Sequence, residues 1–116
     1  MADCIFCKIS SHEIQAQPMI VYEDTEIIGF HDINPQAPLH ILVIPKQHFS
    51  SPNEFGLEHK DLLGRLIVVA IQIARQEKLA ERGYRMVINC GTDGGQAVPH
   101  MHLHLLSGRH MDWPPG

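Results

Sequence analysis

The sequence predicts an α+β fold in which a five-stranded, mostly antiparallel sheet packs against one long helix. Short apolar runs of strand length follow one another with turn residues between them, and a helical apolar pattern occurs once. Strands joined by short connections pair antiparallel, and the helix then covers one face of their sheet. With 116 residues, 44% of them hydrophobic, the chain is expected to form one domain spanning 1–116.

The strands and turns are predicted in chain order. Residues 4–10 form one short helical turn, and Asp24-Thr25 is the turn of a hairpin between the first two strands. Pro35 and Pro38 make residues 34–38 a loop, because proline lacks a backbone donor. The five strands are expected at residues 20–23, 26–32, 40–44, 84–90 and 100–106.

The long helix is predicted from about Leu57 to Arg82, with Gly83 as the residue that ends it. Its main apolar stripe, at i, i+3, i+4 spacing, is Leu62, Leu63, Leu66, Ile67, Ala70, Ile71 and Ala74. Three further apolar residues, Val68, Val69 and Ile73, lie off that stripe. A helix that is apolar on more than one side is usually buried on more than one side. We therefore expect one face on the sheet and another against a partner subunit.

The composition disfavours several classes of function. A net charge of −4 is unusual for a protein that binds nucleic acid through its phosphates. No apolar run reaches the roughly 18 residues that a bilayer requires, and Met1-Ala2-Asp3-Cys4 lacks the layout of a signal peptide. Three cysteines without an export signal do not form a disulfide framework. We expect a cytoplasmic protein that binds neither nucleic acid nor membrane.

Histidines and apolar residues alternate in the last predicted strand, in a chain that has nine histidines. A strand repeats every two residues, so His100, His102 and His104 are expected on one accessible face, with the residues between them in the core. The three histidines have three possible interpretations: they are ordinary surface histidines, they form a metal site with His-x-His ligands, or they catalyse a reaction through imidazole without a metal. Periodicity alone does not separate the last two.

A glycine-rich loop, residues 91–98, leads into the histidines. Gly94 and Gly95 have no Cβ, so their backbone can approach a ligand closely. Concave arrays of backbone N–H groups bind anions. The loop and the histidines together indicate an anion site.

Several segments together carry a resemblance to a known family. They are His-φ-His-φ-His-φ-φ at 100–106 (φ, a hydrophobic residue), the stretches 30–40, 42–46, 84–89 and 93–96, and the ending Trp113-Pro114-Pro115-Gly116. This combination covers nearly the whole chain and resembles the histidine triad (HIT) family. Its ending is similar to the histidine triad nucleotide-binding (Hint) branch. The resemblance implies a single HIT domain over 1–116.

The resemblance implies a purine nucleoside phosphoramidase. Such an enzyme hydrolyses the P–N bond of adenosine 5'-monophosphoramidates or aminoacyl-adenylate-type conjugates to AMP. His102 resembles the nucleophile, which forms a covalent nucleotidyl-histidine; a backbone carbonyl that accepts its other ring proton would fix the tautomer. His100 and His104 would flank the phosphorus, and His104 would help to protonate the leaving amine. His40 resembles the family's fourth active-site histidine, and the chemistry requires no cofactor.

The family's substrate contacts also have counterparts here. Asp32 resembles the ribose-binding acid, and Phe30 and Ile33 would pack against the base. The residues that resemble the family's phosphate-side contacts are Asn89, Gly95, Gln96 and Ala97. At position 97 the branch commonly has Ser or Thr, and Ala97 lacks the hydroxyl group of those residues. The family's dimer interface implies a homodimer with a continuous ten-stranded sheet, in which Trp113 lies near the partner's leaving-group pocket.

A Cys-x-x-Cys pair, Cys4 and Cys7, has the spacing of zinc ligands but supplies only half a site. Some bacterial relatives resemble this chain in the pair and in a histidine after Pro-Lys, here His48. Transferred here, their zinc ligands are Cys4, Cys7, His48 and His100, a closed and therefore structural site. The alternative is a pair of free thiols in a frayed terminus.

Two other functions remain open on the sequence alone. A metal-dependent hydrolase would use the three histidines as ligands and would lose turnover with a chelator. A nucleotide-binding or scaffold protein would bind AMP without cleaving an amidate, and Ala97 leaves that open. The sequence does not indicate the physiological substrate or a preference between adenine and guanine.

Overall fold

The computed structural model describes residues 3–116; Met1 and Ala2, part of the stretch inspected for a signal peptide, lie outside the described residues. The strands are β1 (Ile20–Glu23), β2 (Ile27–His31), β3 (Leu39–Pro45), β4 (Arg85–Ile88) and β5 (Leu103–Ser107). The helices are α1 (Ile5–Ser10) and α2 (Lys60–Gln76), with short 3-10 turns η1 (Pro52–Glu54) and η2 (Leu57–His59). All neighbours in the sheet order β1-β2-β3-β5-β4 pair antiparallel. The predicted five-stranded antiparallel sheet with one long helix is confirmed.

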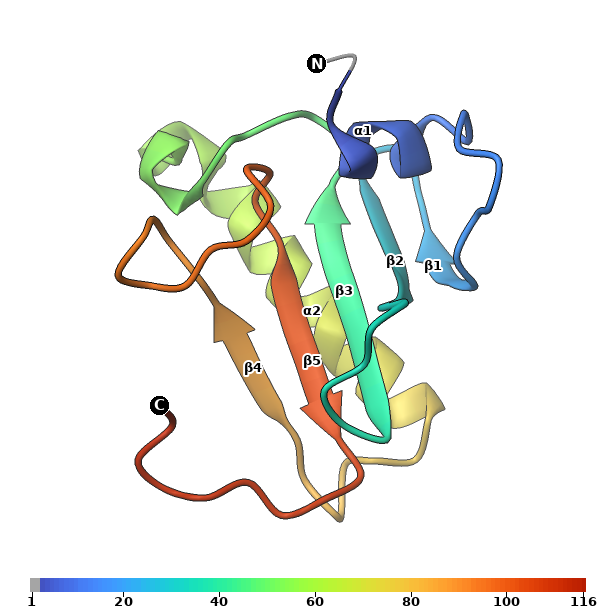
Figure 1. Ribbon diagram of the computed structural model, residues 1–116, viewed down its shortest axis with the longest axis vertical. Coiled ribbons are helices and arrows are strands. Elements are labelled where there is room, and N and C mark those ends of the chain that lie inside the picture. The colour runs from blue at the N-terminus through green and yellow to red at the C-terminus, as the bar shows by residue number, and fades with distance from the viewer. Residues whose placement is uncertain (1–2) are drawn as a thin grey trace.

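The two faces of the sheet are covered differently. Helix α2 lies across one face and packs on β1, β3 and β5 (Figure 1). The other face carries a smaller cluster in which Phe6 and Ile9 of α1 pack on Phe30 and Leu42 of the sheet. The short helix α1 therefore covers only one end of this second face, the end at which β3 finishes (Figure 1). Neither α-helix within residues 3–116 is long and apolar enough to cross a membrane.

The long helix is shorter than predicted. It begins after η2 and ends at Gln76, and Lys78 then adopts a left-handed φ of 60°. The Leu79 N–H donates to the Ala74 carbonyl (2.8 Å) and the Lys78 N–H to the Arg75 carbonyl (3.0 Å). This pair of bonds is a Schellman motif, which ends a helix. The predicted end at Arg82, with Gly83 as the stop, was therefore wrong by six residues, since the helix ends at Gln76.

The buried stripe of α2 also differs from the prediction. The fully buried residues are Leu66, Val69, Ala70, Ile73 and Ala74. Val69 and Ile73, which lay off the predicted stripe, belong to the core, whereas Ile67 and Val68 are exposed by 38% and 51%. The second apolar side of the helix is therefore the Ile67–Val68 side.

The last strand starts at Leu103, three residues later than predicted. Upstream of it the Met101 N–H donates to the Phe49 carbonyl (2.6 Å) rather than to a strand neighbour. Consequently the expected accessible face of three histidines does not form, because His100 is 0% and His102 5% exposed. Only His104 lies within β5 and is partly accessible.

Candidate active site

A largely apolar pocket of about 240 Å³ opens on the sheet face away from α2. The predicted contacts Phe30, Asp32 and Ile33 line it at the end of β2. Its other wall is apolar, from α1 and the segment after it: Ile5, Phe6, Ile9, Ile14, Ala16 and Pro18. Sequence analysis missed this wall, although Ile5, Phe6 and Ile9 have the spacing of one helix face. An apolar slot with one carboxylate at its rim has the character of a nucleoside site.

Strand register places the active-site candidates on one face. Phe30 in β2 pairs with Leu42 in β3, which in turn pairs with His104 in β5. His40 lies two residues before Leu42 and so shares its face. The sheet itself therefore brings His104, His40 and the pocket residue Phe30 together.

His40 and His104 form a hydrogen-bonded pair. The Gln36 backbone N–H donates to His40 Nδ1 (3.0 Å), and His40 Nε2 lies 2.8 Å from His104 Nδ1. Since Nδ1 of His40 is an acceptor, its proton is on Nε2 and is donated to His104 Nδ1. His104 then carries its own proton on Nε2. Asp32, whose carboxylate is 3.5 Å from His40 Nε2, adds a negative charge beside the pair.

Burial keeps this pair neutral. Desolvation, with the neighbouring His102 and His40, lowers the pKa of His104 from 6.5 to about 4. Desolvation also lowers the pKa of His40, against the opposing effect of Asp32. Both rings are therefore neutral near pH 7, as the donor and acceptor assignment above requires.

His102 lies next to the pair with its tautomer fixed. Its Nδ1 is 2.7 Å from the His100 carbonyl oxygen, so Nδ1 carries the proton and donates it there. In the neutral ring, Nε2 then holds a free lone pair. The ring packs edge-on against His104 and Phe6, with centroids 4.9 and 5.2 Å away. A buried neutral imidazole with one free nitrogen can act as a nucleophile.

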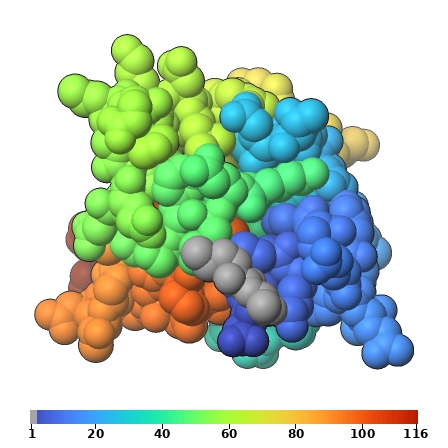
Figure 2. Space-filling view, turned by 90° about the horizontal axis from the view of Figure 1, so that it is seen from above, coloured from blue at the N-terminus to red at the C-terminus, as the bar shows by residue number. Residues whose placement is uncertain are grey.

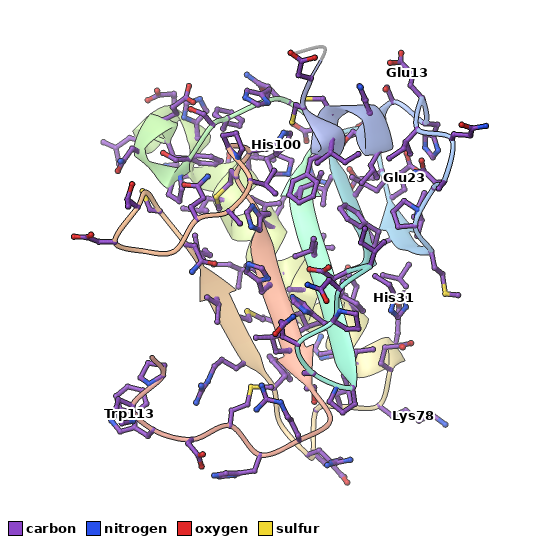
Figure 3. All side chains as sticks on the ribbon, viewed as in Figure 1. Glu13, Glu23, His31, Lys78, His100 and Trp113 are labelled. Atoms are coloured by element: carbon purple, nitrogen blue, oxygen red, sulfur yellow. The ribbon has the colours of Figure 1, made fainter. Side chains whose placement is uncertain are left out.

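His100 faces away from the other two histidines. Its Nε2 lies 2.8 Å from the Pro45 carbonyl, and its Nδ1 is 3.4 Å from Cys4 Sγ. Both ring nitrogens are therefore engaged, and the predicted role of His100 as a donor to phosphate oxygens is corrected. The cause is the late start of β5, which removes His100 from the strand alternation. Figure 3 shows His100 beside α1, at the opposite end of the molecule from Trp113.

The four predicted zinc ligands meet at this end. Figure 2 looks down on it: the N-terminal segment, the segment after β3 and the loop between β4 and β5 gather there. The ligand atoms of Cys4, Cys7, His48 and His100 all lie within 4.8 Å of one another. The distances from His100 Nδ1 are 3.2 Å to His48 Nδ1, 3.4 Å to Cys4 Sγ and 3.6 Å to Cys7 Sγ. Tetrahedral zinc with ordinary Zn–N and Zn–S bonds requires about 3.3–3.8 Å between its ligands.

The chemistry of this cluster fits a cation as well as its geometry does. Burial and the adjacent Cys4 thiol raise the pKa of Cys7 to about 11, so a thiolate there needs a positive charge beside it. Burial lowers the pKa of His100 to about 4, which leaves the ring neutral and able to coordinate. The Pro45 carbonyl accepts the other His100 ring proton, the usual outer partner of a zinc-bound histidine. Two thiolates and two neutral imidazoles suit Zn²⁺.

The predicted phosphate-side residues lie in the loop between β4 and β5, outside the lining of the apolar pocket. The Asn89 side chain donates to the Gly94 carbonyl (2.6 Å), and Gln96 Nε2 donates to the Ser50 carbonyl (2.7 Å). Gly94 has no room for a side chain, since a Cβ would meet the Cys90 carbonyl oxygen at 2.3 Å. The side chains of Asn89 and Gln96 thus shape the loop. The backbone N–H groups of Gly95 and Gln96 donate within it, to the Thr92 and Gly91 carbonyls at 3.1 and 3.0 Å, and Ala97 is exposed.

The C-terminal tail is anchored on β4, and Trp113 lies outside the lining of the apolar pocket. Arg85 in β4 donates to the Met111 and Asp112 carbonyls, at 3.2 and 2.9 Å. The next residue, Trp113, is 83% exposed. An indole so exposed at the end of an anchored tail is available for contact with another molecule.

Comparison with known proteins agrees with this geometry. The HIT domain family model matches residues 13–111. The chain is 50% identical to a 14 kDa zinc-binding protein of Brassica juncea (98% of this chain, 100% of the relative) and 49% identical to the purine nucleoside phosphoramidase of Escherichia coli K12 (94% and 90%). A HIT family hydrolase from Legionella pneumophila superposes with a TM-score of 0.94 at 47% identity, covering 98% of this chain and 100% of that one. The chain belongs to the HIT domain family of nucleotide hydrolases.

Proposed function

We propose that this protein is a purine nucleoside phosphoramidase that releases AMP from adenosine 5'-monophosphoramidates through a nucleotidyl-histidine at His102. The single observation that carries the proposal is the 2.7 Å contact of His102 Nδ1 with the His100 carbonyl, which leaves Nε2 as a free nucleophile beside the pocket. The 49% identical Escherichia coli relative is a purine nucleoside phosphoramidase, which supports the reaction class.

In the proposed complex the base lies in the apolar pocket and the ribose at Asp32. Phe30 and Phe6, whose rings meet edge to face with centroids 5.7 Å apart, form adjoining walls of that pocket. The Asp32 carboxylate accepts hydrogen bonds from the ribose hydroxyls, and Ile33, 89% exposed, closes over the base. The phosphate then faces the histidines and the backbone of the loop at 91–98.

The reaction has two steps. His102 Nε2 attacks phosphorus and the P–N bond breaks; the leaving nitrogen takes a proton from solvent, while neutral His104 donates a hydrogen bond to it through Nε2–H. Water then attacks the nucleotidyl-histidine, its hydroxyl bonds to phosphorus, its other proton goes to solvent, and AMP leaves with His102 restored. The nucleotidyl-His102 ring is a cation between the steps, and the neutral ring of His104, with its centroid 4.9 Å away, places no like charge beside it. His40 keeps the His104 proton on Nε2 by donating to His104 Nδ1.

A structural Zn²⁺ held by Cys4, Cys7, His48 and His100 is part of the proposal. Bound there, the ion would tie the N-terminus to the sheet and to the segment after β3. A metal-dependent hydrolase that uses the three histidines as ligands is less well supported, because His100 Nδ1 points to the cysteines and His102 Nδ1 to a backbone carbonyl, so the three rings do not present their ligand atoms to one ion.

We also propose a homodimer joined along β4. This strand ends the sheet order of the described chain, and no strand of residues 3–116 pairs with its outer edge. Exposed apolar side chains occur on β4 and on α2: Ile88 is 41% exposed, and Ile67 and Val68 are 38% and 51% exposed. An open edge beside an apolar face is normally covered. Light scattering at micromolar concentration should give the dimer mass for the wild type, and a monomer mass would refute the arrangement.

The decisive experiment is turnover of adenosine 5'-monophosphoramidate by the wild type and by His102→Ala, each with and without a chelator. We expect AMP release that disappears in His102→Ala, and a trapped nucleotidyl adduct detectable by mass spectrometry in the wild type alone. Release lost on adding the chelator, with the fold intact and no adduct, would favour the metal-dependent reaction. AMP binding without release would favour a nucleotide-binding protein.

A further inference from the structure

Helix α1 lies between the four-ligand cluster and the nucleotide pocket. It has only six residues, and a helix of that length is not stable without tertiary contacts. Cys4 is its N-cap, with Sγ accepting from the Cys7 N–H at 3.4 Å, and both thiols belong to the cluster. The position of α1 therefore depends on the same sulfur atoms that would hold the ion.

Phe6 carries the position of α1 into the pocket. It lies between the two cysteines in sequence, is 6% exposed and lines the pocket. Its ring contacts His102, His100 and Phe30 edge to face, with centroids at 5.2, 5.8 and 5.7 Å. A shift of α1 would thus move one wall of the base pocket and, at the same time, the Phe6 ring that packs against His102.

His100 makes a second connection between the cluster and His102. Its Nδ1 is a cluster atom, its Nε2 is fixed on the Pro45 carbonyl at 2.8 Å, and its own carbonyl accepts from His102 Nδ1 at 2.7 Å. Without an ion, His48 Nδ1 and His100 Nδ1 face each other at 3.2 Å, where only one proton fits between two lone pairs. That contact, and those to the two thiols, are weak compared with bonds to a metal.

We propose that the cluster controls the nucleotide pocket: Zn²⁺ binding at Cys4, Cys7, His48 and His100 fixes α1 and His100, and so tightens nucleotide binding through Phe6 and the orientation of His102. The inference rests on the proposed nucleotide function of the pocket. Coupling between two sites is reciprocal, so bound nucleotide must tighten the zinc site by the same factor. Couplings of this kind typically change affinity about 5- to 150-fold.

Calorimetric titration of the zinc-loaded and the chelator-stripped protein with AMP tests the coupling. We expect the zinc-loaded form to bind AMP about tenfold more tightly, and AMP to raise the zinc affinity by the same factor in competition with a chromogenic chelator. Cys7→Ser should bind AMP like the stripped wild type. Cys90→Ser removes the cysteine that lies outside the cluster and is the matched control, expected to behave like the wild type.

Phe6→Leu separates positioning from mere stability. If Phe6 transmits the coupling, Phe6→Leu binds AMP more weakly and loses most of the zinc response, the remainder passing through His100, although it still takes up one zinc ion. Equal AMP affinity of loaded and stripped wild type, both folded by thermal melting, overturns the proposal. So does a Phe6→Leu variant that keeps the full zinc response.

A readout without nucleotide distinguishes this proposal from the proposed function. Zinc loading should shift the ring resonances of Phe6 and His102 in NMR spectra of the ligand-free protein, while Cys90→Ser gives the same shifts. If AMP binds to neither form but these shifts occur, the proposed function fails and the connection from cluster to pocket stands. If the rings do not respond to zinc, the connection is refuted whatever the affinity for AMP.

Discussion

Replacing His40 by leucine tests the proton arrangement of the site most directly. His40 is 4% exposed, and its Nε2 lies 2.8 Å from His104 Nδ1. Among the described contacts, this is the only hydrogen bond that keeps His104 Nδ1 unprotonated and in the role of acceptor. Without it, His104 can move its proton to Nδ1 and lose the Nε2 donor that faces the substrate. Loss of one positioned hydrogen-bond donor to the reacting group costs about 10²–10³-fold in kcat. Because part of the His104 population keeps the productive tautomer, we expect kcat to fall about 10- to 100-fold, equivalent to about 1.4–2.7 kcal/mol.

Steady-state kinetics with adenosine 5'-monophosphoramidate measures the effect, and KM should change little because His40 does not line the nucleoside pocket. His40→Gln is the matched control, since its amide can still donate to His104 and should retain more activity than leucine. The ¹⁵N shifts of His104 report the tautomer directly. A His40→Leu variant that folds, keeps kcat within about twofold and leaves the His104 tautomer unchanged would refute the reasoning.

Three further predictions concern binding and stability. Asp32→Asn removes the carboxylate that would accept hydrogen bonds from the ribose hydroxyls. KM for the ribonucleoside substrate should rise about tenfold, because roughly one charge-assisted hydrogen bond is lost. KM for a 2',3'-dideoxy analogue, which lacks those hydroxyls, should stay the same. The burial-lowered pKa values of His40 and His104 (about 4 for His104) lie below the unfolded value of 6.5, so the unfolded state binds more protons. The melting temperature of the ligand-free protein should therefore decline as pH falls from 6.5 to 4; a constant value over that range contradicts the burial argument. Lys78→Gly relieves a left-handed φ of 60° at the end of α2 and should stabilise the fold by about 0.5–1 kcal/mol in urea unfolding, whereas Gln72→Gly within the helix should destabilise it by a similar amount.

The sequence predicts the sheet well because its strands are marked by local signals. Turn residues separate the apolar runs, and the antiparallel pairs β1–β2, β2–β3 and β4–β5 join strands that are consecutive in the chain, whereas the central β3–β5 pair joins strands on either side of α2 and is not set by a local connection. The end of α2 was not predictable in the same way. Gly83 is the stronger stop signal, but the Schellman bonds form at Lys78, a residue whose left-handed conformation carries a cost that packing of Leu79 against the core offsets.

The histidine pattern and the glycine-rich loop predict which histidines and which loop form the site. They do not predict the apolar wall that α1 adds to the pocket. Ile5, Phe6 and Ile9 form part of that wall, yet a six-residue helix gives too short a pattern to show which face it buries or against what. The position of α1 is fixed by contacts of Cys4 with His100 and of Cys7 with His48, which are 96 and 41 residues apart in the sequence. Only the tertiary structure brings these together.

The alternation of His100, His102 and His104 predicts a shared face, and the structure instead gives each histidine a separate environment. The ladder between β3 and β5 reaches only Leu103, so the two-residue period that governs His104 does not govern the others. His100 turns its ring to the cysteines, and the turn that accomplishes this places its carbonyl 2.7 Å from His102 Nδ1. Departure from the strand is thus what creates the acceptor that fixes the His102 tautomer. A regular strand would direct that carbonyl into the ladder, and the nucleophile proposed here would lose its partner.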